Sequence, residues 1–241
     1  GINEEKASIL FSEIEKFAGY GFNKSHAAAY AMIAYQTAYL KANFPLEFFC
    51  ALMNCDIGNF EKLSIYCNEI KKIGFSVIGP NINDSDAIFM VDYDNNLPRS
   101  IKFGLSAIKN IGENSINELV NERKINGNFK NLNDLLKRVS NNVLNKKILE
   151  ALIHSNSLVS IEDNQGLLYE NIDKILTYNC NYHKNLNKDQ SDLFAEHDDF
   201  NDYLTRNDSF KWDKNKKLQM EIEAFGFYLS EHPTKIYKSV Y

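Results

Sequence analysis

Apolar side chains recur at intervals of three and four residues over most of the chain, which is the spacing of amphipathic helices. In the segment 60–73, for example, Leu63, Cys67, Ile70 and Ile73 are expected on one side of a helix. Pro45 separates two helices, because the residue before a proline leaves the helical region. The pattern predicts helices over residues 3–17, 24–42, 45–54 and 60–73, through most of 105–178, and over 214–225.

The pattern changes in two places. Residues 88–103, "IFMVDYDNNLPRSIKF", predict a short β-hairpin that turns at Asn95-Asn96. Residues 179–213 are polar and rich in Asn, Asp and Lys, and we expect a loosely ordered linker there. The predicted fold class is mainly α with small β elements (α+β).

Composition narrows the class of protein. The 241 residues are 44% hydrophobic and 24% charged, as in soluble globular proteins, and allow one large domain or two ordinary ones. No apolar run approaches the roughly 20 residues of a membrane span, so we expect no membrane partner. The chain starts with Gly and a charged helical segment, so we expect a fragment or a processed piece without a signal peptide.

The four cysteines, Cys50, Cys55, Cys67 and Cys180, form no C-x-x-C pair. No His follows them at zinc spacing either, so we expect no metal site in this chain. Reduced thiols are typical of the cytoplasm, which is the expected location.

Charge is unevenly distributed. Residues 101–149 hold nine lysines and arginines against four acids, whereas 189–202 hold six acids and no Lys or Arg. A basic block beside an acidic one indicates two kinds of surface. Solvated faces of ordinary helices would give the same pattern.

The stretch "FAGYGFNKSHAAAY", residues 17–30, combines a helix start with candidate ligands for an anion. The first turn of a helix has free N–H groups and the positive end of the helix dipole. Asn23, Lys24, Ser25 and His26 add to this a phosphate-binding character, the alanines leave room, and Tyr30 is available for stacking. Alternatively, Asn23 only caps the helix, and Lys24 and His26 are solvated.

The stretch "LSAIKNIGENSINEL", residues 105–119, is typical of a helix-hairpin-helix. Gly112 would let the backbone come close to a phosphate, and the following helix would offer its N-terminal amides. Such a site reads the DNA backbone and not its sequence. The candidate DNA-binding residues are Lys109, Asn110, Ile111, Gly112 and Asn114. A plain turn between two helices would also explain the stretch.

The segment "FAGYGFNKSHAAAYAMIAYQTAYLKANFPLEFF", residues 17–49, closely resembles the fingers region of the bacterial replicative (C-family) DNA polymerases, the DNA polymerase III alpha subunits. Weaker resemblance continues through "VIGPNIN", "IKFGLSAIKNIGE", "LNKKILEALIHS" and "EIEAFGFYLSEHP". The resemblance implies that Lys24, Ser25 and His26 lie near the incoming nucleotide or the nascent base pair. It also implies a second hairpin over 144–158, where Asn156 replaces the family's usual glycine. Asn tolerates the left-handed backbone that a helix cap needs, but the change leaves a phosphate contact there open.

The resemblance also implies a domain order. Residues 1–85 would be the distal fingers, 86–178 a tandem helix-hairpin-helix domain that binds duplex and clamp, 179–213 a linker, and 214–241 the lead-in to an OB-fold. The linker sequence "QSDLF" resembles the sliding-clamp-binding motif of bacterial replication proteins. Its candidate residues are Gln190, Asp192, Leu193 and Phe194. A short tether back onto the core would also explain two apolar residues in a polar loop.

The resemblance implies a parent enzyme that is a DNA-directed DNA polymerase. Its Mg²⁺ ions would be held by palm carboxylates outside this chain, which we therefore expect to be inactive alone and to carry no cofactor. Its partners would be primer-template duplex DNA, dNTPs, the β sliding clamp and the other subunits of the replicase holoenzyme. Two alternatives remain: a free-standing helix-hairpin-helix DNA-binding adaptor, and an error-prone paralogue of the replicase.

Overall fold

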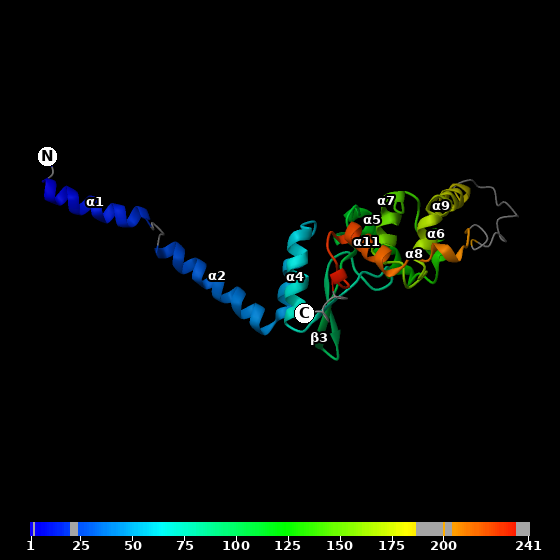
Figure 1. Ribbon diagram of the computed structural model, residues 1–241, viewed down its shortest axis with the longest axis horizontal. Helices are drawn as coiled ribbons and strands as arrows, with labels where there is room; N and C mark the ends of the chain where they lie inside the picture. The colour runs from blue at the N-terminus through cyan, green and yellow to red at the C-terminus, as the bar shows by residue number, and fades with distance from the viewer. Residues whose placement is uncertain (2, 20–23, 187–199, 201–203, 235–241) are drawn as a thin grey trace. The chain divides into compact units, whose positions relative to one another are not determined.

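The computed structural model describes residues 1, 3–19, 24–186, 200 and 204–234 (Figure 1). The chain forms two compact units, Gly1–Phe48 and Phe49–Tyr241. Within the described residues, no helix combines the length and the apolar character that crossing a membrane requires. The architecture is mainly helical with one small sheet, as the sequence predicts.

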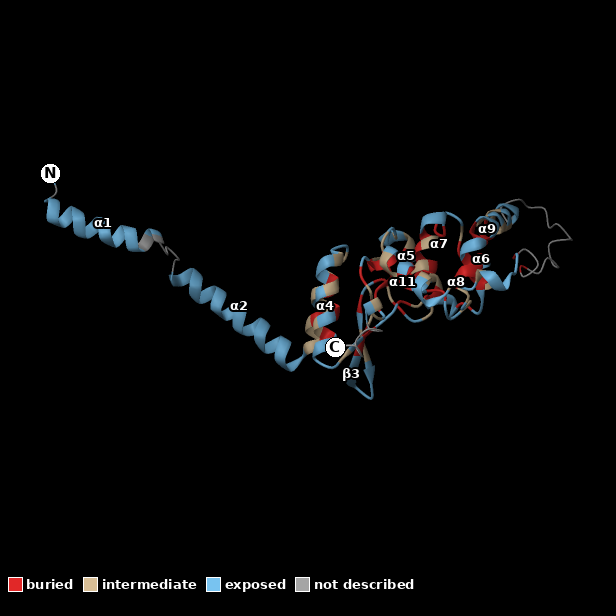
Figure 2. Cartoon of the chain, viewed as in Figure 1, coloured by how far each residue is buried: buried red, intermediate tan, exposed pale blue. Residues whose placement is uncertain are grey.

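The first unit contains α1 (Glu4–Gly19), α2 (Lys24–Asn43) and the first residues of α3. These helices confirm the prediction, and α2 ends at Asn43, just before Pro45 begins α3 (Pro45–Cys55). None of the residues of α2 is buried, although the helix carries Tyr30, Met32 and Ile33 (Figure 2). The helix is therefore not stabilised by a buried face of its own.

The second unit holds the remaining elements. They are α4 (Phe60–Lys72), β1 (Ser76–Ile78), β2 (Met90–Asp94), β3 (Leu97–Lys102), η1 (Leu105–Ala107), α5 (Glu113–Asn126), α6 (Leu132–Arg138), α7 (Lys146–His154), α8 (Gln165–Glu170), α9 (Ile172–Leu186), η2 (Asp208–Phe210) and α11 (Lys214–Phe225). Their buried side chains form the core that Figure 2 shows in red.

The sheet has three strands in the order β1-β3-β2. The predicted hairpin is confirmed: β2 and β3 are antiparallel, and Asn95 and Asn96 have φ values of 49° and 64°. Positive φ at both central residues is required by the type I′ turn, whose backbone twist matches the twist of the two strands it connects. The sequence pattern missed β1, which pairs parallel to β3 with Val77 opposite Ile101.

Aromatic residues from distant parts of the chain build the core behind the sheet. The rings of Phe89 and Phe103 are 4.8 Å apart, and Phe225 of α11 lies 4.8 Å from Phe103. Such edge-on pairs add stability beyond the area they bury. The C-terminal helix is therefore part of the same core as the hairpin.

Two expectations about element ends need correction. Ile73 is 44% exposed, because α4 ends at Lys72 and the cap residue turns away from the buried side. The helices do not stop at residue 178, because α9 continues to Leu186. Asn179 is fully buried there, and its amide donates to the carbonyls of Leu136 and Val139, which ties this part of α9 to the end of α6.

Candidate nucleic-acid interface

The predicted hairpin lies between η1 and α5. Its left-handed residue is Asn110, with φ 64°, while Gly112 has an ordinary extended backbone with φ −82° and ψ 135°. Gly112 is therefore not required by backbone conformation. An added Cβ there would meet nothing within 4 Å, so what the glycine provides is open space for a close partner.

The start of α5 is uncapped by any side chain. Gly112 is its N-cap residue and makes no side-chain hydrogen bond, and Gly112, Glu113 and Asn114 are exposed. The first N–H groups of a helix have no partner inside the helix. This turn therefore offers backbone donors to an oxyanion, although the carboxylate of Glu113 adds a negative charge beside them.

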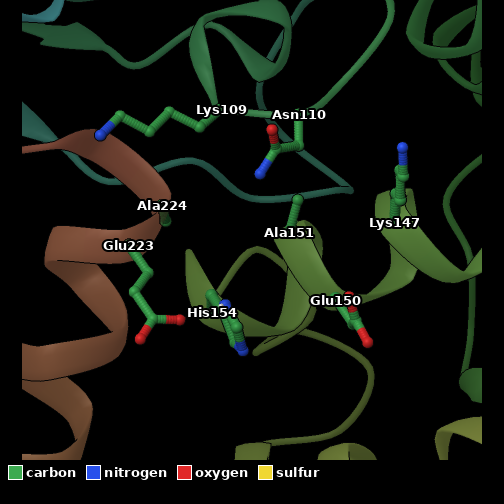
Figure 3. Close-up of a pocket in the computed structure, with 8 residues that line it drawn as sticks. All are labelled: Lys109, Asn110, Lys147, Glu150, Ala151, His154, Glu223 and Ala224. Atoms are coloured by element: carbon green, nitrogen blue, oxygen red, sulfur yellow. Dashed lines mark ion pairs between the residues drawn. The ribbon is translucent and has the colours of Figure 1, made fainter.

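A pocket of about 320 Å³ lies beside the hairpin (Figure 3). The hairpin, α7 and α11 meet around it. Its lining residues are Lys109, Asn110, Lys147, Glu150, Ala151, His154, Glu223 and Ala224. The pocket thus brings Lys147, which the sequence did not single out, next to the predicted hairpin.

The basic block is much less basic at the surface than its sequence suggests. Lys102, Lys124, Arg138 and Lys146 form ion pairs with acids of the fold. Arg123 is buried and donates to the carbonyl of Ile82 at 2.6 Å. Burial lowers the pKa of Arg123, although the neighbouring Asp86 and Asp84 oppose this. Five of the nine cations are therefore either paired with an acid or, in the case of Arg123, buried.

Lys147 and Lys109 differ in their surroundings. Lys147 is exposed in the first turn of α7, a position where the helix dipole disfavours a cation, and it makes no ion pair with a described residue. Lys109 runs toward α11 (Figure 3). Its Nζ lies 4.9 Å from the centre of the Phe60 ring. A lysine in a helix's first turn was the signal in the sequence that could have drawn attention to Lys147.

The second predicted hairpin contains α7, which is capped by Asn145. Asn156 has φ 58°, so it adopts the left-handed conformation expected of the residue in place of glycine. Ser155 and Ser157 on either side are buried and 2.7 Å apart through their hydroxyls. The left-handed cap that the sequence allows at Asn156 is therefore formed.

His154, the last residue of α7, lies between two other aromatic residues and an acid. Its ring is 5.5 Å from that of Tyr169 and 6.2 Å from that of Trp212, and its Nδ1 is 3.5 Å from Glu223. Burial lowers the pKa of His154, against the opposing charges of Glu223 and Glu150. The neutral imidazole is favoured in this packing.

The other predicted nucleotide-binding residues lie at the start of α2. Lys24, Ser25 and His26 occupy its exposed first turn, which contains no acidic residue. The His26 ring contacts that of Tyr30 edge-on, with centroids 4.5 Å apart. Three of the polar groups and the aromatic ring are thus at one helix start, while Asn23 lies outside the described residues.

The predicted clamp-binding residues Gln190, Asp192, Leu193 and Phe194 also lie outside the described residues. Among the residues that are described, no group of three or more His, Cys, Asp or Glu side chains could hold a metal ion.

Comparison with known proteins gives a consistent result. The family model described as "Helix-hairpin-helix motif" matches residues 74–168, which include both hairpins. A DNA polymerase III subunit alpha of Neisseria meningitidis is 40% identical over 233 residues, which are 97% of this chain and 20% of that protein. The subunit of Borreliella burgdorferi is 40% identical over 241 residues, 99% of this chain and 21% of that protein. That of Rickettsia bellii is 35% identical over 263 aligned residues, covering 100% of this chain and 22% of that protein.

The chain thus spans about a fifth of the length of the curated relatives it matches. The matches include the fingers-like helices, both hairpins and the C-terminal helix, since they cover nearly every residue of the chain. By sequence, the chain corresponds over nearly its whole length to one segment of the DNA polymerase III alpha subunits, a segment that contains a helix-hairpin-helix motif.

Proposed function

We propose that the chain serves as part of the catalytic subunit of a bacterial replicative DNA polymerase, which copies a template from dNTPs in the cytoplasm. The observation that carries the proposal is the similarity to DNA polymerase III subunit alpha over 97% or more of this chain. Within that enzyme, the chain contributes binding surfaces. Mg²⁺ and the residues that hold it belong to other parts of the enzyme.

The first surface is the hairpin that follows Lys109, in which Asn110, Ile111, Gly112 and Asn114 bind the backbone of primer-template duplex DNA. Support comes from the uncapped start of α5 and from the open space at Gly112. A phosphate oxygen there accepts hydrogen bonds from the N–H groups of the first turn. These contacts join the protein main chain to the DNA sugar-phosphate backbone and do not involve the bases. Binding is therefore independent of DNA sequence.

Binding of a labelled duplex to this chain tests the proposal. With two or three phosphates neutralised, log affinity should fall with log salt concentration with a slope of roughly −2 to −3. Gly112→Val places a side chain between backbone and phosphate, yet it fits the extended backbone and the empty space at this position. We expect a small loss of thermal stability, because valine is a poorer N-cap than glycine, and roughly 10- to 150-fold weaker binding on every duplex sequence, because one charge-assisted hydrogen bond contributes about 1.5–3 kcal/mol.

Gly79→Ala provides the control, because an added Cβ at Gly79 meets only Leu229, at 4.0 Å. Its DNA affinity should equal that of the wild type. Affinity that does not depend on salt, or that requires a particular base sequence, would contradict the proposal.

The second surface is the start of α2, which faces the incoming dNTP and the nascent base pair. Asn23, Lys24, Ser25 and His26 bind phosphate, and Tyr30 lies near the pair. The absence of any acid from this first turn supports anion binding. The small side chains of Ala27, Ala28 and Ala29 allow a base pair to come close.

The third surface is the motif Gln190, Asp192, Leu193 and Phe194, which binds the β sliding clamp. Through the clamp and the other replicase subunits, the polymerase stays on its template. The motif lies between α9, which ends at Leu186, and Phe200, which is buried. Leu193 and Phe194 are the apolar residues of the motif, and an apolar pocket of a partner would take them as anchors.

A further inference from the structure

Lys109 joins three parts of the second unit. Its backbone N–H donates to the carbonyl of Ala224 at 2.9 Å, near the end of α11. Its ammonium lies over the ring of Phe60, the first residue of α4, at 4.9 Å from the ring centre. The hairpin is therefore attached to α11 through its backbone and to α4 through a side chain.

Gly226 leaves the path for this side chain open. A Cβ added to Gly226 would lie 2.8 Å from the Nζ of Lys109 and 3.0 Å from its Cε. Gly226 also has φ 77° and ends α11 with a hydrogen bond from its N–H to the carbonyl of Ile222. The left-handed backbone therefore favours glycine at this position, and the absence of a Cβ leaves room for the end of the Lys109 side chain.

Lys147 has the opposite character. Its side chain rises from α7 on the other side of Asn110 (Figure 3), where it is exposed and lies in a first turn that disfavours a cation. The neighbouring Lys146 forms an ion pair with Asp173 at 3.0 Å, which offsets its unfavourable interaction with the helix dipole. No described residue forms an ion pair with Lys147. An anion in front of the hairpin and α7 would neutralise Lys147 without breaking any contact of the fold.

We propose that Lys147 supplies the cation that binds DNA phosphate beside the hairpin, and that Lys109 is a positioning residue that holds the hairpin through Phe60 and Gly226. This inference rests on the proposed binding of duplex DNA. It assigns the phosphate contact to one lysine and the positioning of the hairpin to the other. A lysine that binds phosphate contributes to the salt dependence of DNA affinity, whereas a lysine that positions the hairpin contributes to stability.

The test measures the salt dependence of duplex binding and the thermal unfolding of this chain for four single variants. Lys147→Met should reduce the steepness of the salt dependence by about 0.9, the contribution of one phosphate contact, with no change in Tm. Lys146→Met, in the same helix turn, is its control and should leave the slope unchanged. Lys109→Met should lower Tm and leave the slope unchanged, and so should Phe60→Leu, which removes the ring and keeps both lysines.

Gly226→Ala gives an independent measurement. It should lower Tm in both backgrounds, because the positive φ strains any residue with a Cβ, and less in the Lys109→Ala background, which removes the Nζ and Cε that lie closest to the new methyl group. Equal losses in both backgrounds would contradict the positioning role.

A slope that decreases with Lys109→Met and not with Lys147→Met would overturn the inference while duplex binding itself stands. Should Lys109→Met fail to fold, Phe60→Leu decides the positioning role by the same two measurements. If the wild-type chain binds no duplex at any salt concentration, the proposed function fails first, and the assignment of Lys147 fails with it.

Discussion

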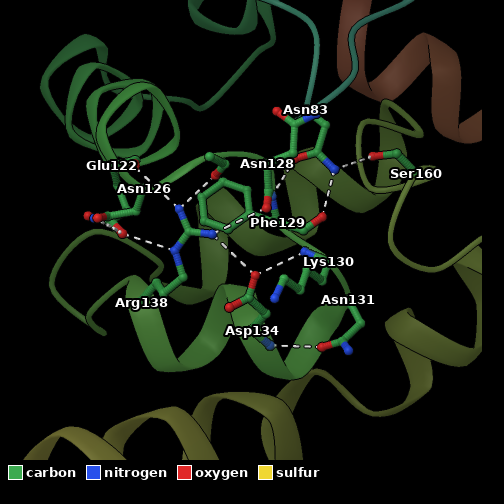
Figure 4. Close-up of polar contacts among 11 residues, drawn as sticks. Asn83, Glu122, Asn126, Asn128, Phe129, Lys130, Asn131, Asp134, Arg138 and Ser160 are labelled. Atoms are coloured by element: carbon green, nitrogen blue, oxygen red, sulfur yellow. Dashed lines mark hydrogen bonds and ion pairs between the residues drawn. The ribbon is translucent and has the colours of Figure 1, made fainter.

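The guanidinium of Arg138 lies on the ring of Phe129, with its central carbon 4.4 Å from the ring centre (Figure 4). The same guanidinium bonds the carboxylates of Glu122 and Asp134 at 3.0 and 3.2 Å and the carbonyl of Gly127 at 2.8 Å. Phe129 is in turn fixed by the side-chain amide of Asn83, whose Nδ2 donates to the Phe129 carbonyl and whose Oδ1 accepts from the Phe129 N–H, both at 2.8 Å. One side chain therefore organises the connection between α5 and α6.

Arg138→Met should destabilise the protein by about 2–3 kcal/mol. The change leaves two partly buried carboxylates without their cation, which costs more than a surface ion pair contributes. The measurement is urea unfolding with an unchanged dependence on denaturant. Lys146→Met is the matched control, because its ion pair with Asp173 is exposed on both sides, and its loss should be much smaller. Equal losses would show that the Arg138 contacts contribute no more than a surface pair.

Stability should depend on pH through His154. Burial lowers the pKa of this imidazole in the folded state. As pH falls below about 6.5, His154 is therefore protonated in the unfolded chain while it is still neutral in the folded protein. The His154 contribution to stability is therefore complete above about pH 6.5 and is lost as pH falls toward the folded-state pKa. Glu223, Glu150 and Lys216 also act on this imidazole, and Tyr169 and Trp212 face it.

His154→Gln should remove this dependence. The difference in unfolding free energy between wild type and variant, measured by urea unfolding from pH 8 to pH 5, should be constant above neutrality and change in favour of the variant below it. The comparison is needed because burial raises the pKa of Glu221, whose own contribution to stability is lost as pH rises. A difference that is constant from pH 8 to pH 5 would contradict the assignment.

Lys24→Ala, made in the complete polymerase subunit, should lower kcat/KM for dNTP incorporation by roughly 10- to 150-fold. The reason is that a charge-assisted hydrogen bond to phosphate contributes about 1.5–3 kcal/mol. Steady-state incorporation of a single nucleotide measures the effect, with unchanged Tm as the check on folding. Lys41→Ala is the control on the same helix, about 25 Å away at a rise of 1.5 Å per residue. Should both variants keep wild-type kinetics, Lys24 is only a solvated surface residue.

Leu193→Ala together with Phe194→Ala should abolish synthesis of long tracts by the complete subunit and spare single-nucleotide incorporation. Two buried anchors each contribute about 2 kcal/mol or more, so affinity for the β clamp should fall by roughly three orders of magnitude. A clamp raises the effective concentration of polymerase at the primer, which matters only for successive additions. Titration of the purified clamp with this chain measures the affinity directly.

The control for the clamp experiment is Asp198→Asn with Asp199→Asn, which changes charge in the same acidic stretch and keeps the apolar pair. This variant should bind the clamp almost as the wild type does. Clamp affinity that is equal for the wild type and for the variant without Leu193 and Phe194 would identify QSDLF as a linker sequence only.

The free cysteines should differ in reactivity toward an alkylating reagent. Cys55 is exposed, whereas Cys67 is buried, and burial raises the pKa of its thiol to about 12. Because the thiolate is the reactive form, Cys55 should be modified in the native protein and Cys67 only after unfolding. Mass spectrometry after timed labelling, with and without denaturant, measures both sites. Rapid native labelling of Cys67 would show that α4 opens readily.

The sequence by itself determined the features that depend on neighbours along the chain. Apolar spacing determined most helices, the pair Asn95-Asn96 determined the hairpin turn, and Asn156 determined a left-handed cap. Each of these is decided by backbone preferences and periodicity within a few residues. The family resemblance likewise rested on short continuous segments, which the comparisons with known proteins extended over nearly the whole chain.

Tertiary structure decided what depends on partners far away in the chain. The three residues of β1 are recognisable as a strand only when Val77 lies opposite Ile101, and α9 continues because Asn179 finds the carbonyls of Leu136 and Val139. Which cations remain without an acidic partner was decided in the same way, since Lys124 pairs with an acid 38 residues earlier while Lys147 pairs with none among the described residues. The physical reason is that Coulomb attraction and hydrogen bonding act through distances in space, which only the packed chain defines.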